Sequence, residues 1–264
     1  MIKQSPTFGI KFTIFLIYLI GFGLHVWVFW DITFSPSTSN NALFSNKHSK
    51  NSVENVRKSI MFIKSGPCVP NGPDASGTGF VIKPGYIATN AHVVKIAESC
   101  NEYLLTDYLG KTHPAKLKTI SSSSNNVLDE ANPFANDLAI LQFDDSSHQF
   151  PPLELTDSSE YEANHETDKV ITIGYPLEGH ASTPGKATVS NEGIISNFDS
   201  QKHLFAPKGL LIDPGNSGGP VFLCKNYKVV GVVVATSKIS KDTAFFIPIN
   251  RLKNFVREKL NIEL

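Results

Sequence analysis

The sequence has no surplus of charge of either sign, no internal repeat and few cysteines. Lys and Arg together number 24 in the 264 residues, and Asp and Glu also number 24. Without a basic surplus, the overall charge implies binding neither to nucleic acid nor to an acidic membrane surface. No Cys/His cluster has metal-ligand spacing, and we expect neither a metal nor an organic cofactor.

Only three cysteines occur, Cys68, Cys100 and Cys224, so at least one is unpaired within the chain. Cys68 precedes and Cys100 follows the segment that contains His92, and a disulfide between them would staple that segment. Their distance cannot be read from the sequence, which leaves this bridge open. Cys224 follows three apolar residues and is predicted to be a small buried hydrophobe rather than a reactive thiol.

Charge is absent over Phe12–Trp30, 19 residues in which His25 is the only strongly polar interruption. A helix of this length spans roughly 28 Å, close to the hydrocarbon thickness of a bilayer. Lys3 and Lys11 precede the segment, and no Lys or Arg follows it until Lys47. The positive-inside rule therefore predicts a cytoplasmic N-terminus and places the rest of the chain outside the cytoplasm, in the periplasm of a bacterium.

A cleaved signal peptide is the alternative to this anchor. The apolar run is longer than the usual 7–15 residues, and no small-x-small cleavage site follows it closely, so a retained anchor is favoured. We therefore expect a cytoplasmic tip and anchor over residues 1–30. The polar, Ser- and Asn-rich residues 31–52 are expected to form a flexible tether, and residues 53–264 one folded unit.

The most informative motif surrounds one serine with three glycines, in the run Pro214–Pro220 (Pro-Gly-Asn-Ser-Gly-Gly-Pro). Glycine adopts backbone angles that other residues avoid, so this turn can present the Ser217 hydroxyl to a ligand. The backbone N–H groups of Gly215 and Ser217 can converge beside that hydroxyl as an oxyanion hole. The motif also fits the nucleophile elbow of esterases and lipases. That elbow needs a histidine downstream of the serine, but the last histidine is His203.

Upstream, two further motifs supply the groups that activate a serine. His92 lies in Thr-Asn-Ala-His-Val-Val at the end of an apolar run, and Asp137 lies in Asn-Asp-Leu-Ala before another. Histidine can take the proton of Ser217 and return it to a leaving group, and a carboxylate can fix the imidazole tautomer. Each residue alone could be structural, as a core histidine, a strand cap or an ordinary turn. Together, in the order His, Asp, Ser, they indicate a catalytic triad.

The sequence resembles the chymotrypsin-like serine proteases, and among them the HtrA/Deg type, from about Ser59 to Val256. Besides the three motifs above, the resemblance rests on Gly77–Ile82, Ile173–Pro176 and Ser190–Ser196. It implies that His92 is the general base, Asp137 its orienting partner and Ser217 the nucleophile, with Gly215 and Ser217 as oxyanion donors. In that family a PDZ domain usually follows; we expect none here, since the sequence runs from one predicted amphipathic helix to Leu264.

The resemblance and the apolar pattern predict an all-β fold of two six-stranded antiparallel barrels, at about residues 53–150 and 151–264. A C-terminal helix is expected to be capped by Asn250 and to pack on the second barrel through one apolar face. That face consists of Leu252, Phe255, Val256 and Leu260. The predicted strands of the two barrels are 59–64, 78–82, 86–91, 116–120 and 138–143, then 169–174, 187–196, 221–224, 229–235 and 244–248.

We therefore expect a membrane-anchored serine endopeptidase that acts on proteins or peptides, plausible roles being envelope protein quality control or regulatory cleavage. Its oligomeric state is left open. The alternative is a silent pseudoprotease that binds peptides. The residue before the scissile bond is expected to be small or medium and apolar, unless Asp213 lines the pocket and selects Lys or Arg. The candidate pocket residues are Leu211, Ile212, Val232, Val233 and Val234, together with Ala235.

Overall fold

The structure is a computed structural model, described here for residues 52–65, 76–95, 101–121, 136–145, 150–157, 167–176, 187–199, 204–236 and 244–264. The predicted anchor, nearly all of the predicted tether, Cys68 and Cys100 lie outside these residues. Within the described segments, no helix is long and apolar enough to span a membrane.

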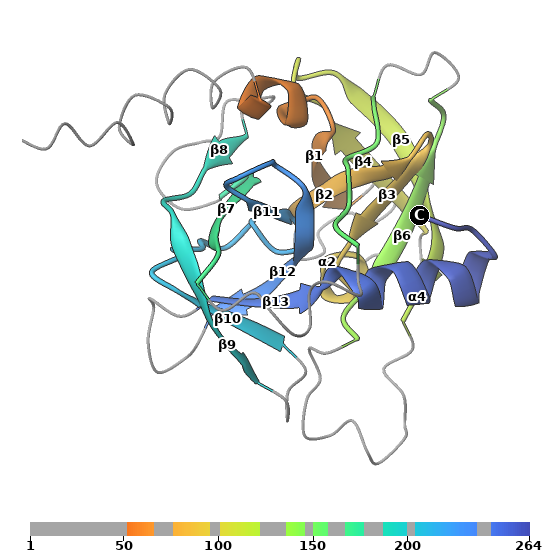
Figure 1. The fold of residues 1–264 in the computed structure, drawn as a ribbon. Coiled ribbons are helices and arrows are strands. Elements are labelled where there is room, and N and C mark those ends of the chain that lie inside the picture. Colours follow the sequence, from red (N-terminus) through yellow and green to blue (C-terminus); the bar gives the residue numbers. More distant parts are fainter. Residues whose placement is uncertain are drawn as a thin grey trace, which may run out of the picture. The chain divides into compact units, whose positions relative to one another are not determined.

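Six antiparallel strands close the first barrel, in the order β1-β2-β3-β6-β5-β4. Figure 1 shows them grouped in the orange-to-green part of the chain. The strands are β1 (Ile60–Ser65), β2 (Ser76–Lys83), β3 (Tyr86–Thr89), β4 (Glu102–Thr106), β5 (Thr112–Ile120) and β6 (Ala139–Phe143).

The second half of the chain forms a sheet in the order β11-β12-β13-β10-β9-β7-β8, and β11 also pairs with β7. That extra pairing closes six strands into the second barrel and leaves β8 attached to the end of β7. The predicted pair of antiparallel barrels is therefore confirmed. The strands are β7 (Lys169–Gly174), β8 (Thr188–Val189), β9 (Gly193–Asp199), β10 (Leu204–Lys208), β11 (Pro220–Leu223), β12 (Val229–Thr236) and β13 (Ala244–Pro248).

Two neighbouring residues of β1 show why this strand is apolar on both faces. Met61 belongs to the cluster that fills the first barrel. Ile60 belongs to a second cluster, which contains residues of both barrels, such as Ile140 of β6 and Phe222 of β11. Because successive side chains of a strand point to opposite faces, β1 contributes to both clusters at once. The shared cluster holds the two barrels together.

Several predicted strand boundaries were wrong. Residues 187–196 form two strands, β8 and β9, and the predicted strand 86–91 ends at Thr89, after which Ala91 opens the short helix α2 (Ala91–Lys95). Strands β4 and β10 were not predicted. Strand β10 contains Pro207, which argues against a strand because proline has no backbone N–H to donate to a neighbouring strand. Pro207 is accommodated where the pairing with β9 shifts register.

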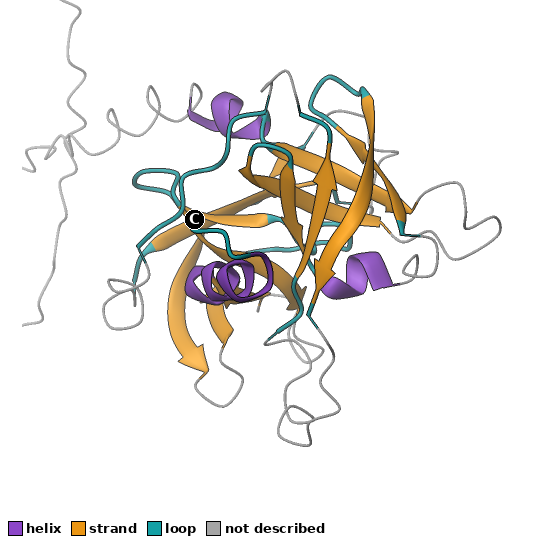
Figure 2. Ribbon diagram, turned by 90° about the vertical axis from the view of Figure 1, so that its right-hand side faces the viewer, coloured by secondary structure: helices purple, strands orange, loops and turns teal. Residues whose placement is uncertain are grey.

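Helix α4 (Ile249–Leu260) packs on β12 and β13 of the second barrel, as predicted. Of the four residues on its predicted face, Leu252 and Val256 are buried, and Phe255 and Leu260 are partly buried against the same cluster. Figure 2 shows the described helices at the periphery of the strands. The predicted cap was wrong. The helix begins at Ile249, after Pro248, without a side-chain cap, and Asn250 lies inside its first turn. The reason is that β13 runs directly into the helix and leaves no turn for a capping residue.

Candidate active site

His92 lies on helix α2, which follows β3 after only one residue. Its neighbours Val93 and Val94 are buried in the cluster of the first barrel. These two valines hold one side of the helix against the barrel and turn the imidazole outward, where 46% of the side chain is exposed. The histidine is therefore anchored through its neighbours while its ring remains accessible.

Asp137 contacts His92 with both carboxylate oxygens. Oδ2 lies 2.5 Å from His92 Nδ1, and Oδ1 accepts the backbone N–H of His92 at 2.9 Å. The aspartate is 93% buried, and its backbone carbonyl accepts a hydrogen bond from Asn90 Nδ2 at 2.8 Å. A carboxylate at Nδ1 favours the tautomer in which that nitrogen carries the proton, so Nε2 is left as the base.

The loop that carries Ser217 is attached to β12 and closed on itself. Gly218 N–H donates to Val233 O, and Val233 N–H donates to Gly219 O, both at 2.9 Å. Within the loop, Gly219 N–H donates to Asn216 O at 2.9 Å, and Asn216 N–H donates to Asp213 O at 3.1 Å. These bonds fix successive peptide units around the serine.

The two predicted oxyanion donors, Gly215 N–H and Ser217 N–H, take no part in the hydrogen bonds described above. Among the described residues, neither Gly215 N–H nor Ser217 N–H donates a hydrogen bond to the protein. Gly215 has a φ of 97°, a conformation that glycine adopts without strain. The loop thus holds two amide groups beside the serine that are free to bind an anionic oxygen.

The serine loop packs against the residues just before His92. A side-chain carbon on Gly218 would lie 2.2 Å from Thr89 Oγ1 and 3.0 Å from Asn90 N. The structure therefore brings the second barrel's serine loop against the first barrel's histidine segment. No hydrogen bond joins His92 to the Ser217 hydroxyl in the described part of the chain. Such bonds are often long in free enzymes and tighten when substrate binds.

The candidate pocket residues do not form a single wall. Ile212 and Val233 lie in the cluster that fills the second barrel, whereas Val232 and Val234 lie in the cluster shared by both barrels. Leu211 is 49% exposed, while the other four are at most 8% exposed. Only Leu211 therefore has substantial surface for a ligand. The side chain of Ala235 lies outside the described residues.

Sequence reasoning treated Thr78 only as part of a motif and missed its place in the site. Thr78 is completely buried in β2, and its hydroxyl donates to Gly215 O at 2.7 Å. A hydroxyl between two glycines, just before the apolar run Phe80–Ile82, was the available signal, because a buried polar group needs a partner.

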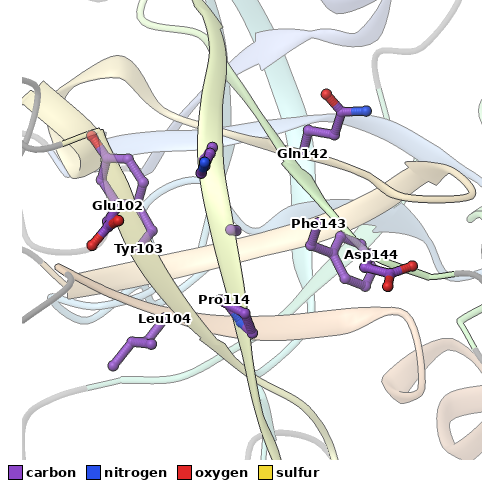
Figure 3. Close-up of a pocket in the computed structure, with 9 residues that line it drawn as sticks. Glu102, Tyr103, Leu104, Pro114, Gln142, Phe143 and Asp144 are labelled. Carbon is purple, nitrogen blue, oxygen red and sulfur yellow. The ribbon is translucent and has the colours of Figure 1, made fainter.

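A separate pocket of about 620 Å³ lies on the first barrel, away from these residues. Figure 3 shows its lining side chains on β4, β5 and at the end of β6. None of them is a candidate catalytic residue. They are Glu102, Tyr103, Leu104, Pro114, Ala115, Lys116, Gln142, Phe143 and Asp144.

Two side chains with raised pKa values, the half-buried Cys224 and the buried Tyr175, are structural residues. Burial raises the pKa of the Cys224 thiol to about 11, which suits the predicted unreactive cysteine. Burial, followed by the charge of Asp107, raises the pKa of Tyr175 well above its usual range. The Tyr175 hydroxyl donates to Ile60 O at 3.3 Å and so links the chain after β7 to β1.

Two closed barrels with a His–Asp pair on one and a glycine-flanked serine on the other define the class of the trypsin-like peptidase domains. The family model described as "Trypsin-like peptidase domain" matches residues 77–232, and the chain belongs to this family.

Proteins of the HtrA/Deg type are among the relatives, which confirms the resemblance seen in the sequence. The chain is 33% identical to the serine protease Do-like HtrA of Bacillus subtilis, over 70% of this chain and 39% of that protein. It is 31% identical to a mitochondrial Do-like 3 protease of Arabidopsis thaliana, over 69% of this chain and 30% of that protein. The chain therefore spans less than half the length of these relatives.

A serine endoprotease from Yersinia pestis, known from a crystal structure, has a similar fold. The TM-score is 0.59 at 24% identity, and the match covers 79% of this chain and 65% of that one. This likeness supports the two-barrel architecture.

Proposed function

We propose that this protein is a serine endopeptidase in which Ser217 is the nucleophile, His92 the general base and Asp137 its orienting partner. The observation that carries the proposal is the double contact of the Asp137 carboxylate with His92, at 2.5 Å to the ring and 2.9 Å to the backbone. A carboxylate that only balanced a charge would not need to fix both the ring and the backbone of one histidine. This arrangement suits a base whose free nitrogen must point at a reacting group.

In the proposed reaction, Ser217 Oγ attacks the carbonyl carbon of a peptide bond while its proton passes to His92 Nε2. The carbonyl oxygen becomes an oxyanion, which the N–H groups of Gly215 and Ser217 stabilise. His92 then gives the proton to the leaving amine, and the C–N bond breaks. Water, activated by the same histidine, hydrolyses the resulting ester of Ser217.

Asp137 acts in this scheme without taking the proton. Its buried carboxylate, 7% exposed, stabilises the imidazolium that forms when His92 accepts the proton of Ser217. The Asn90 side chain, which donates to the Asp137 backbone carbonyl, supports this carboxylate from the same segment that carries His92.

For specificity we propose cleavage after small or medium apolar residues. Leu211, the exposed member of the candidate set, offers apolar surface just before the serine loop. Asp213 is exposed and is the nearby acid that could select a basic residue instead. A basic side chain in an apolar pocket without a carboxylate partner would lose its hydration without compensation.

We further propose that the peptidase is tethered to a membrane through residues 12–30 and faces the periplasm. The uncharged run of 19 residues and the lysines on its N-terminal side support this topology. A role in envelope protein quality control or regulatory cleavage would suit that location.

The proposal is tested by labelling the purified protein with a biotinylated fluorophosphonate and locating the adduct by mass spectrometry. Labelling of wild type at Ser217, its loss in Ser217→Ala, and peptide cleavage by wild type alone are expected. A folded wild-type protein that neither labels nor cleaves would contradict the proposal, and binding of peptides by that protein would then favour the pseudoprotease alternative.

A further inference from the structure

Thr78 lies at the point where β2 of the first barrel contacts the serine loop of the second barrel. It is completely buried and takes part in four hydrogen bonds. Its N–H donates to Ser217 O at 2.9 Å, and its hydroxyl donates to Gly215 O at 2.7 Å. The hydroxyl oxygen accepts Tyr175 N–H at 3.0 Å, and Thr78 O accepts the Thr89 hydroxyl at 2.8 Å.

The backbone packs closely around Thr78 at three glycines. A side-chain carbon on Gly174 would lie 2.9 Å from Thr78 Oγ1, and one on Gly218 would lie 2.3 Å from Thr78 O. A side-chain carbon on Gly219 would lie 3.2 Å from the Thr78 methyl group. Three glycines thus allow the backbone to approach this one residue, two of them at its side chain and Gly218 at its carbonyl.

The hydroxyl bond acts on the peptide unit that connects the two oxyanion donors. This unit joins Gly215 to Asn216, so its orientation sets the direction of Gly215 N–H relative to Ser217 N–H. Its carbonyl accepts the Thr78 hydroxyl, and its N–H donates to Asp213 O at 3.1 Å. Both ends of the unit are therefore held.

These two hydrogen bonds matter because the Gly215 backbone, which has no side chain, does little by itself to keep its conformation. Gly215 has a φ of 97° and can reach many other backbone conformations at low cost. If the unit were released, the backbone angles of Gly215 and Asn216 on either side of it could change, and the two donors that flank it would no longer be held in convergence.

We propose that the Thr78 hydroxyl is a positioning group that keeps the oxyanion-binding loop in its working conformation. This inference rests on the proposed peptidase function for its kinetic consequence but not for its structural one. Thr78 touches neither substrate nor the reacting atoms; it acts through the Gly215 carbonyl.

The kinetic test compares Thr78→Val, which removes the hydroxyl while keeping the shape, with Thr78→Ser, which keeps the hydroxyl. Thr78→Val is expected to lower kcat by about 10- to 100-fold with KM changed by less than about threefold, because donor alignment stabilises only the transition state. Thr78→Ser should retain kcat within about threefold. Equal kcat in wild type and Thr78→Val, or an equal loss in both variants, would overturn the proposal.

Thr156→Val is the matched control. Thr156 is also buried, and its hydroxyl donates to Val229 O at 3.0 Å, away from the serine loop. It loses the same kind of hydrogen bond and should lose stability but not kcat. If Thr78→Val does not fold, Thr78→Ala, which adds no methyl group facing the loop, takes its place in the same comparison.

A second readout separates this proposal from the proposed function. Amide hydrogen exchange of Asn216, measured by NMR, should become at least about tenfold faster in Thr78→Val, since the peptide unit is released at one end. Exchange of Gly218, whose N–H bonds to Val233 O, should stay unchanged. If neither amide responds, Thr78 does not hold the loop. If Asn216 responds but wild type fails to label with fluorophosphonate, only the peptidase assignment fails.

Discussion

The carboxylate of Asp137 holds His92 at two points, the ring nitrogen Nδ1 and the backbone N–H, although 45 residues separate them in the chain. The aspartate is buried and the imidazole is half exposed. One side of the pair is therefore shielded from water, and the other can reach a substrate. The hydrogen bond between Asp137 and His92 is strengthened by the low local dielectric, while the His92 ring remains accessible as a base.

The first prediction concerns the proposed triad. Ser217→Ala and His92→Ala are each expected to lower kcat by about 10⁶-fold, and Asp137→Asn by about 10⁴-fold. The double variant Ser217→Ala/His92→Ala should be no slower than the single ones, because the groups act as a unit. Peptide cleavage rates test this, with circular dichroism to show that each variant is folded. Near wild-type cleavage by Ser217→Ala would disprove the nucleophile assignment.

The second prediction compares two glycines with positive φ, Gly218 at 83° and Gly209 at 80°. Gly218→Ala is expected to cost about 2–5 kcal/mol, because strain adds to a clash with Thr89 Oγ1 and Thr78 O. Gly209→Ala should cost only about 1–2 kcal/mol, since the added carbon would lie 3.9 Å from Glu192 O, an ordinary contact distance. Urea denaturation measures both. Equal losses would mean that the serine loop is not closely packed against β2 and β3.

The third prediction follows from the Cys224 thiol. Its pKa is raised from an ordinary 9.0 to about 11, so at pH 8 the reactive thiolate is about 100-fold scarcer than in the unfolded chain. Iodoacetamide at pH 8 should therefore modify Cys224 at least about tenfold more slowly in the folded protein than in urea. Peptide mapping by mass spectrometry distinguishes this cysteine from Cys68 and Cys100.

The same thiol has a consequence for stability. Between about pH 9 and about pH 11 the Cys224 thiol is still protonated in the folded protein but ionised in the unfolded chain. The unfolded state therefore binds fewer protons in this range. The free energy of unfolding should therefore fall as the pH rises from about 9 to about 11. Cys224→Ser should weaken this dependence, and the same slope in both proteins would contradict the assignment.

The fourth prediction concerns the residue before the scissile bond. A peptide library should be cut mainly after small or medium apolar residues, consistent with the exposed Leu211 beside the serine loop. Asp213→Asn is the control and should leave the cleavage profile unchanged. Dominant cutting after Lys or Arg that disappears in Asp213→Asn would make Asp213 the specificity residue.

The fifth prediction concerns topology. A tag placed after Leu264 should be digested by external protease in spheroplasts, and deletion of residues 1–50 should release a soluble enzyme with unchanged kcat. A cytoplasmic marker protein serves as the control for intact membranes. Protection of the tag in intact spheroplasts would reverse the orientation inferred from Lys3 and Lys11.

Local pattern was sufficient for much of this fold. The short apolar runs of β1 and β6, and the apolar run before His92, predict strands because each is only a few residues long and is bounded by polar or turn residues. The same reasoning failed where a local signal conflicted with pairing, as at Pro207 in β10, and where one element runs into the next, as at Asn250 in α4. The pairing of a strand and the first residue of a helix depend on tertiary contacts, which involve residues distant in the sequence.

The available chemical groups and their order can be read from the chain directly, because His92, Asp137 and Ser217 are each marked by a short motif. Their arrangement in space depends on contacts between distant segments. The bond between Thr78 and Gly215 spans 137 residues, and the division of Val232 and Val233 between two clusters depends on where each barrel lies. The physical reason is that motifs report short-range backbone preferences, whereas the alignment of an oxyanion-binding loop depends on hydrogen bonds to whatever surface the fold brings beside it.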